Sequence, residues 1–125
     1  MDTTSRVLKL PEAPRDFAPW IDGPPVAAED REIYTRHSPA HDAPVTRIPM
    51  GTAEDLDTAV AAARRAFDDR RWSGLSGADR AAVLLRAADG IRARAEELAY
   101  WETLENGKPI AQARAEVGGC PGMYE

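Results

Sequence analysis

The sequence predicts a mostly helical chain that begins with a short β-hairpin and a few short strands. Of its ten prolines, all but Pro109 and Pro121 fall within the first 49 residues, so the front of the chain is extended and the back is helical. The run from Ser76 to Pro109 also has a helix start, an apolar stripe and a helix stop in the right order. We therefore divide the chain into a loose arm (residues 1–16), a β-hairpin with short strands (17–50) and a helical segment (51–125).

The central helical run has clear signals at both ends. Ser76 and Asp79 are spaced as a capping box, in which the hydroxyl accepts from a first-turn amide and the carboxylate accepts from the N–H of the cap residue. At the other end Asn106-Gly107 supplies a left-handed stop and Pro109 prevents continuation. Apolar residues recur between these ends at helical spacing: Leu84, Ala88, Ile91, Ala95, Leu98, Trp101 and Leu104.

We expect this run to be interrupted. A straight helix over residues 77–106 would extend roughly 45 Å, whereas a compact domain of this length is only about 35 Å across. Gly90 weakens the middle of the run, and Glu96 and Glu97 suit the first turn of a new helix. These features predict a break near Arg92–Arg94.

Two further helices flank the central run. The first follows Thr52, which forms a second capping box with Asp55, and its predicted buried stripe is Leu56, Val60, Ala63 and Phe67. In the link that follows it, Trp72 is expected to pack over the helix junction. After Pro109, residues 110–117 are predicted to form a third helix that meets Gly118-Gly119, with no finishing element before Glu125.

Short strands are predicted in the proline-rich front. Residues 17–21 are expected to form a strand, the turn residues of Asp22 to Pro25 follow, and residues 26–28 pair back. Residues 32–36 and 45–48 are two more candidate strands. All are short and edged by proline, so they require a larger body to pack against.

Composition excludes several classes of function. The chain has 125 residues and a net charge of -5, and its basic residues are interleaved with acids, which argues against nucleic acid or a membrane surface as a partner. Neither a signal-peptide core nor a membrane span is visible, so the expected location is cytoplasmic.

Few residues have the chemistry of a catalytic or metal site. We interpret the single cysteine, Cys120, as a structural thiol, because GGCPG offers no neighbouring histidine or lysine to activate it. His37 and His41 could pair at a metal ion, but we do not interpret them so, since no third ligand of fitting spacing is near. The sequence has no glycine-rich dinucleotide loop and no Ser, His and acid set. The residues alone therefore predict a soluble, mostly helical segment without an active site of its own.

The order of motifs resembles the amino-terminal part of the NAD(P)-dependent aldehyde dehydrogenase superfamily. The similarity covers about residues 17–117 and rests on these stretches in register: WIDG from Trp20, SPA from Ser38, VTRIPMGTAEDLDTAVAAARRAFDDRRWS, DRAAVLLRAADGIRARAEELA and WETLENGKPIAQARAEV. It implies that the chain corresponds to the opening part of an α/β cofactor-binding domain within a much longer enzyme.

The family reaction implied by this resemblance is the NAD(P)-dependent oxidation of an aldehyde to a carboxylic acid through a thiolate nucleophile. The catalytic cysteine, general-base glutamate and cofactor contacts of the family lie later in its sequence, so none is assigned here, and Cys120 does not match the nucleophile motif. Some relatives bind a structural cation at positions matched by Glu105 and a residue near Arg36. Because both residues differ from the family pattern, we expect no metal site.

Two functions remain open at this stage. The first is a partial aldehyde dehydrogenase that lacks activity alone and either self-associates or needs the remainder of the fold. The alternative is a stand-alone helical module that binds a protein partner through its apolar stripes. Neither reading identifies the aldehyde.

Overall fold

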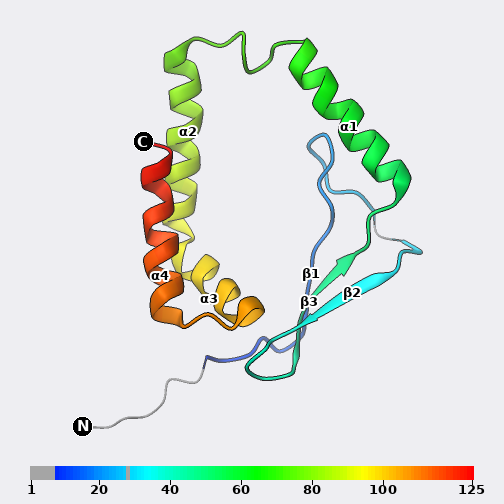
Figure 1. Cartoon of the computed structure of the whole chain (residues 1–125), viewed down its shortest axis with the longest axis vertical. Coiled ribbons are helices and arrows are strands. Elements are labelled where there is room, and N and C mark those ends of the chain that lie inside the picture. Colours follow the sequence, from blue (N-terminus) through cyan, green and yellow to red (C-terminus); the bar gives the residue numbers. More distant parts are fainter. Residues whose placement is uncertain (1–7, 28) are drawn as a thin grey trace.

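The computed structural model describes residues 8–27 and 29–125, in which the chain forms an open ring with a small sheet on one side and a group of helices on the other (Figure 1). A fold that is mostly helical with a small amino-terminal β part is therefore confirmed. Within the described residues the strands are β1 (Arg15–Asp16), β2 (Ile33–His37) and β3 (Pro44–Pro49), and the helices are α1 (Ala53–Asp68), α2 (Gly77–Ala93), α3 (Ala95–Asn106), α4 (Ile110–Gly119) and the 3₁₀ turn η1 (Cys120–Met123).

The sheet has the order β1-β3-β2, with β3 in the centre. β2 pairs with β3 in antiparallel register and β1 pairs with β3 in parallel. The strands predicted at residues 32–36 and 45–48 are confirmed, with ends that differ by one residue.

The first strand lies elsewhere than predicted. Residues 17–21 do not form a strand; the paired residues are Arg15 and Asp16, and only the Phe17 N–H continues the ladder by donating to the Arg47 carbonyl at 3.0 Å. β1 is held by backbone hydrogen bonds, and both of its side chains are exposed. Its sequence therefore lacks the apolar alternation from which a strand can be predicted. The predicted loose arm is thus wrong at its carboxyl end, while residues 1–7 lie outside the described part of the chain.

The predicted turn at Asp22-Gly23 is present. Both residues have positive φ, 56° and 108°. The arms meet through a single bridge between Trp20 and Pro25, and the Val26 N–H donates to the Pro19 carbonyl at 2.8 Å. The hairpin stays this narrow because its prolines supply no N–H groups to a ladder, and Ala28, part of the predicted second arm, lies outside the described residues.

The two predicted helix caps differ in detail. Thr52 and Asp55 form both bonds of a capping box, at 3.1 Å and 2.8 Å. Ser76 accepts from the Asp79 N–H at 3.1 Å, but the Asp79 carboxylate accepts from the Ser76 hydroxyl at 2.6 Å. The cap of α2 is therefore confirmed, while the reciprocal bond to the Ser76 backbone is not formed.

The predicted break and stop of the central run are confirmed. Arg94 leaves helical geometry, with φ -118° and ψ 16°, and α3 sets off from α2 in a new direction (Figure 1). Gly107 ends α3 with φ 74° in the left-handed region. Glu96 and Glu97 occupy the first turn of α3, where their negative charges interact favourably with the positive end of the helix dipole.

The core centres on α3. On one side of α3 the buried Ala99 packs with Ala113 and Val117 of α4, supported by partly buried Ile91, Ala95 and Ile110. On the other side α3 contacts the sheet, where Leu104 and Val45 are both fully buried. α3 therefore joins the helical side of the ring to the sheet.

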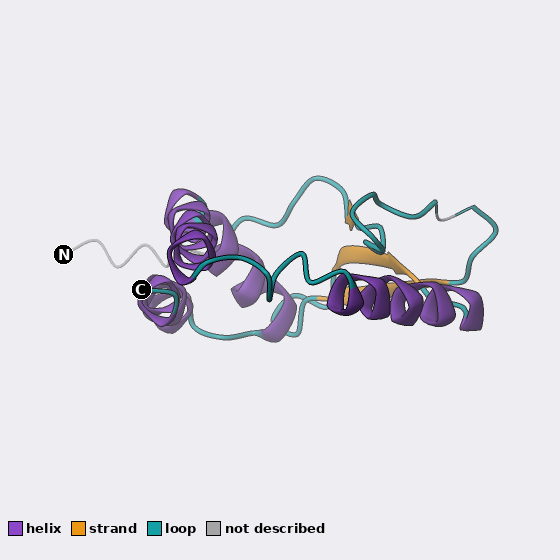
Figure 2. Cartoon of the chain, turned by 90° about the horizontal axis from the view of Figure 1, so that it is seen from above, coloured by secondary structure: helices purple, strands orange, loops and turns teal. Residues whose placement is uncertain are grey.

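The buried stripe predicted for α1 is wrong. Leu56, Val60 and Phe67 are 65%, 60% and 71% exposed, and Ala63 is exposed as well. The buried residue of α1 is Ala62, on a face that turns toward the Trp20–Asp22 turn. α1 and α2 lie far apart in both views, so no helix covers the large side chains (Figure 2). For the same reason Trp72, in the link, is 44% exposed and does not cover a helix junction.

The carboxyl end has more regular secondary structure than predicted. α4 continues through Gly118 and Gly119, and η1 follows at once, with Pro121 buried and η1 packed against α2. Burial of Pro121 compensates for the low helix propensity of Gly118 and Gly119. The sequence pattern alone does not reveal this tertiary contact.

Replacing Gly107 with alanine should lower the free energy of unfolding by roughly 1 kcal/mol, because alanine resists the left-handed region. The new Cβ would also lie 3.4 Å from the Pro39 Cβ. Gly90→Ala is the matched control: it lies inside α2 with no atom within 4 Å of an added Cβ, and should be neutral or stabilise by about 0.5–1 kcal/mol. Urea unfolding checks both, and a Gly107→Ala midpoint at or above that of the wild type would contradict the assignment.

Candidate functional site

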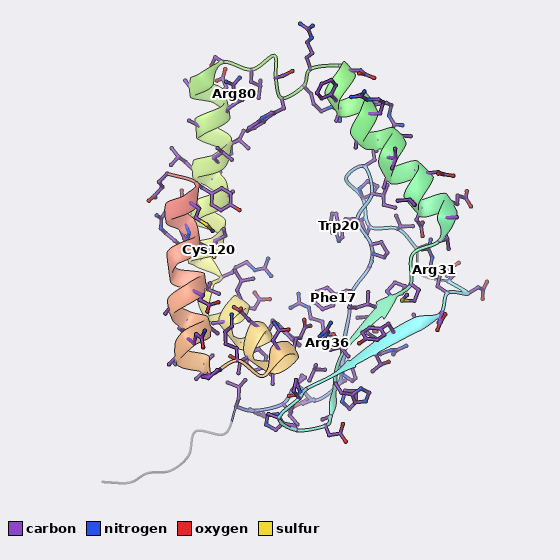
Figure 3. All side chains as sticks on the ribbon, in the orientation of Figure 1. Phe17, Trp20, Arg31, Arg36, Arg80 and Cys120 are labelled. Carbon is purple, nitrogen blue, oxygen red and sulfur yellow. The ribbon has the colours of Figure 1, made fainter. Side chains whose placement is uncertain are left out.

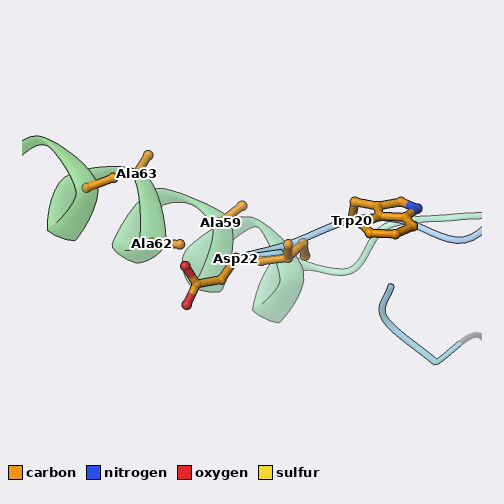
Figure 4. Close-up of a pocket in the computed structure, with 7 residues that line it drawn as sticks. Trp20, Asp22, Ala59, Ala62 and Ala63 are labelled. Carbon is orange, nitrogen blue, oxygen red and sulfur yellow. The ribbon is translucent and has the colours of Figure 1, made fainter. Parts of the chain in front are cut away.

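A hollow of about 280 Å³ lies between the Trp20–Asp22 turn and α1. Its wall on α1 consists of alanines, as Figure 4 shows, and Trp20 at its edge is 72% exposed. Asp22 is the one acidic group in the wall, and it accepts a hydrogen bond from Arg65 at 2.8 Å. The hollow can accommodate an apolar group by shape, and its one carboxylate, Asp22, is paired with Arg65.

A second hollow, of about 450 Å³, lies at the amino-terminal end of α1. Here Arg31 forms a two-pronged ion pair with Asp55, one prong at 3.0 Å. This pair, together with the Thr52 N–H, lowers the pKa of Asp55 far below its ordinary value. Asp55 therefore stays ionised and cannot serve as a general acid near neutral pH.

The first turn of α1 is the one place in the described residues where a strand leads directly into a helix. β3 is followed by Met50–Thr52 and then α1, an arrangement that in other proteins binds phosphate. In this chain Glu54 and Asp55 occupy that turn, and Asp55 already accepts from the Thr52 N–H. Negative charge at the helix end repels a pyrophosphate, so these residues do not fit a dinucleotide cofactor.

The amino-terminal segment is fastened to α3 by a cluster around Arg15. The Arg15 guanidinium lies 2.9 Å from the Glu97 carboxylate, 5.0 Å from the centre of the Phe17 ring and 5.5 Å from that of Trp101. Arg94 also donates to Glu97, at 2.9 Å and 3.0 Å. Hydrogen bonds from Arg94 and then Arg15 lower the pKa of Glu97 to about 2, from an ordinary value of 4.5.

Lys108, in the turn between α3 and α4, is held by two carboxylates. Its ammonium donates to Glu102 and to Glu116. These hydrogen bonds raise the pKa of Lys108, so the amine stays protonated at neutral pH and cannot act as a nucleophile. Its role is to join the end of α3 to α4.

The other reactive side chains are dispersed. Figure 3 places Cys120 on the helical side of the ring and Phe17 and Trp20 on the hairpin side. The half-buried Cys120 thiol donates to the Glu116 carbonyl at 3.3 Å, as a structural thiol does. His41 bonds the Ser38 hydroxyl at 3.0 Å within the β2–β3 turn. Over residues 8–27 and 29–125, no three His, Cys, Asp or Glu side chains gather to hold a metal ion.

The resemblance connects Glu105 and a position near Arg36 with a cation, and the structure brings Arg36 itself beside Glu105. The Arg36 guanidinium lies 3.5 Å from the Glu105 carbonyl oxygen. A guanidinium is permanently charged, and a second cation at this carbonyl would be repelled by it. The Arg36 side chain therefore disfavours a cation at the Glu105 carbonyl.

Comparison with known proteins gives the family. Residues 26–125 match the aldehyde dehydrogenase family. The chain belongs to the aldehyde dehydrogenase family. Among curated aldehyde dehydrogenases it is 36% identical over 106 residues to betaine aldehyde dehydrogenase of Bacillus subtilis, covering 85% of this chain and 22% of that enzyme. It is 44% identical over 102 residues to the NADP/NAD-dependent aldehyde dehydrogenase PuuC of Escherichia coli, covering 81% of this chain and 21% of that enzyme.

Solved aldehyde dehydrogenases have the same local fold. The crystal structure of the NAD-dependent aldehyde dehydrogenase of Sinorhizobium meliloti superposes with a TM-score of 0.84 at 43% identity, covering 90% of this chain and 22% of that one. The chain therefore spans about a fifth of the length of the aldehyde dehydrogenases it matches. In the described residues, no helix has both the length and the apolar character needed to cross a membrane.

Glu97→Gln should lower the melting temperature at pH 7 and have less effect in acid. Because the folded pKa lies below the ordinary value, the stabilisation is complete above about pH 4.5 and is lost as the pH falls toward 2. Glu32→Gln is the control, since Glu32 is exposed and shows no ion pair in the described structure. Thermal unfolding from pH 7 to pH 2 tests this, and a Glu97→Gln deficit independent of pH would refute the role of its charge.

Proposed function

We propose that this chain forms the opening part of the cofactor-binding domain of an NAD(P)-dependent aldehyde dehydrogenase and has no activity alone. The complete enzyme would oxidise an aldehyde to a carboxylic acid, in the cytoplasm. The observation that supports the proposal most directly is the superposition on the Sinorhizobium meliloti enzyme, in which these elements make up only 22% of the chain.

The contribution of these residues is structural. In this proposal β1–β3 and α1–α4 form a scaffold beside the cofactor site, and their charged groups hold it together. Asp55, Glu97 and Lys108 are each held in ion pairs between segments. Since the acidic first turn of α1 does not fit a dinucleotide, we assign none of the described residues to the cofactor, to the substrate or to a catalytic step.

The 125-residue chain should neither bind NAD or NADP nor oxidise an aldehyde. Its acidic helix terminus repels phosphate, and no activated nucleophile was found among the described residues. Calorimetric titration with each dinucleotide measures this, with the complete Sinorhizobium meliloti enzyme as the positive control. One-to-one micromolar binding to the short chain would contradict the proposal.

The isolated chain should also self-associate or be only marginally folded. Covering a side chain such as Leu or Phe stabilises by about 1.5–3 kcal/mol, and the whole stability of a typical domain is about 5–15 kcal/mol. Leu56, Val60 and Phe67 lack cover in this structure. Sedimentation and thermal unfolding test this: a monodisperse monomer that melts sharply above about 60 °C would instead favour a stand-alone interaction module.

A further inference from the structure

The carboxyl-terminal end of α3 is a negatively charged place in the fold. Its last turn, residues 103–106, includes Glu105 and has no basic side chain. The last carbonyls of an α-helix receive no N–H from a following turn, and this end carries roughly half a negative charge from the helix dipole. A cation placed at the end of α3 therefore stabilises it.

Arg36 reaches this end of α3 from the sheet. Its part-buried guanidinium lies 3.5 Å from the Glu105 carbonyl oxygen (Figure 3). The strand register fixes this placement, because Arg36 of β2 and Arg15 of β1 pair with Thr46 of β3 from its two sides. Side chains of paired residues lie on one face of a sheet. Arg15 contacts Glu97 of α3 at 2.9 Å, so this face is the one that α3 covers.

The other basic residue at this corner has different partners. Lys108 follows the end of α3, but its ammonium donates to Glu102 and Glu116. Among the described residues, Arg36 is thus the basic side chain whose hydrogen bond reaches a carbonyl of the last turn of α3. The β2–β3 turn also touches the helix stop, since a Cβ added to Gly107 would lie 3.4 Å from the Pro39 Cβ.

We propose that the Arg36 guanidinium takes the place of the structural cation that the resemblance connects with this corner, so that no alkali-metal ion is needed to hold β2 against α3. The positive charge at the end of α3 belongs to the chain itself. A guanidinium stays charged throughout the pH range of folded proteins, and it repels a metal ion at the Glu105 carbonyl. This inference concerns stability and does not depend on the proposed activity.

The first test measures the thermal midpoint of the 125-residue chain. Arg36→Thr removes the guanidinium and keeps a residue suited to a strand, and it should lower the midpoint by about 2–5 °C. Arg36→Lys keeps the charge and should recover at least about half of this loss. Arg47→Thr is the matched control, because half-exposed Arg47 pairs only with Asp16, at 3.5 Å, and it should shift the midpoint by less than about 1 °C. An Arg36→Thr midpoint equal to that of the unsubstituted chain would overturn the proposal.

The second test compares midpoints in KCl, NaCl and choline chloride at equal ionic strength. It uses the 125-residue chain and a chimera in which residues 26–125 replace the matched segment of the Sinorhizobium meliloti aldehyde dehydrogenase, so that self-association of the short chain does not prevent a result. The unsubstituted proteins should melt at the same temperature in all three salts. Arg36→Thr in the chimera should melt higher in KCl or NaCl than in choline chloride, because backbone carbonyls are ligands for hard cations.

Two results of the salt series would overturn the proposal. One is an unsubstituted midpoint that rises with K⁺ or Na⁺ relative to choline, which would show that a metal ion binds in spite of Arg36. The other is an Arg36→Thr loss of the same size in all three salts, which would make Arg36 an ordinary hydrogen-bond donor and not the replacement for a cation.

Discussion

The packing of α3 on both of its sides holds this molecule together. α3 contacts β3, and Leu104 of α3 and Val45 of β3 are both fully buried, while Ala99 packs against α4. The corner at Arg94 and the stop at Gly107 set the length of α3 between these contacts. The Arg15 cluster and the bond from the Tyr100 hydroxyl to the Lys9 carbonyl, at 2.8 Å, then fasten the amino-terminal segment to the same helix.

A small core of this kind leaves much apolar surface without a partner. Most of the buried aliphatic residues of the described chain are alanines, while Trp20, Phe67 and Leu56 remain largely exposed. A self-contained domain buries its largest apolar side chains first, because the gain increases with area. This distribution of apolar side chains fits a segment of a longer protein: the chain covers 22% of the solved enzyme, which is about five times longer. The burial pattern thus agrees with the family assignment independently of the sequence match.

The strongly shifted pKa values among the described residues are caused by ion pairs. Such shifts mark active sites only when the group faces a cavity with a reacting partner. Asp55 is fixed between Arg31 and the start of α1, Glu97 between two arginines, and Lys108 between two glutamates. Each group links segments and keeps its ordinary charge, so the electrostatics stabilise a scaffold.

Features set by neighbouring residues were predictable from the sequence alone: the cap at Thr52, the break at Arg94, the stop at Gly107 and the family itself. The cap, the break and the stop each depend on bonds or dihedral preferences within a few positions. The family is recognisable because motifs that match it in register occur along most of the chain. Only the tertiary structure decided where β1 begins, that η1 follows α4, and which face of α1 is covered. These features depend on packing surfaces and pairing strands that lie far away in the sequence. A helical stripe shows that a face is apolar, but its burial requires a second surface, and for Leu56, Val60 and Phe67 the described part of this chain does not provide one.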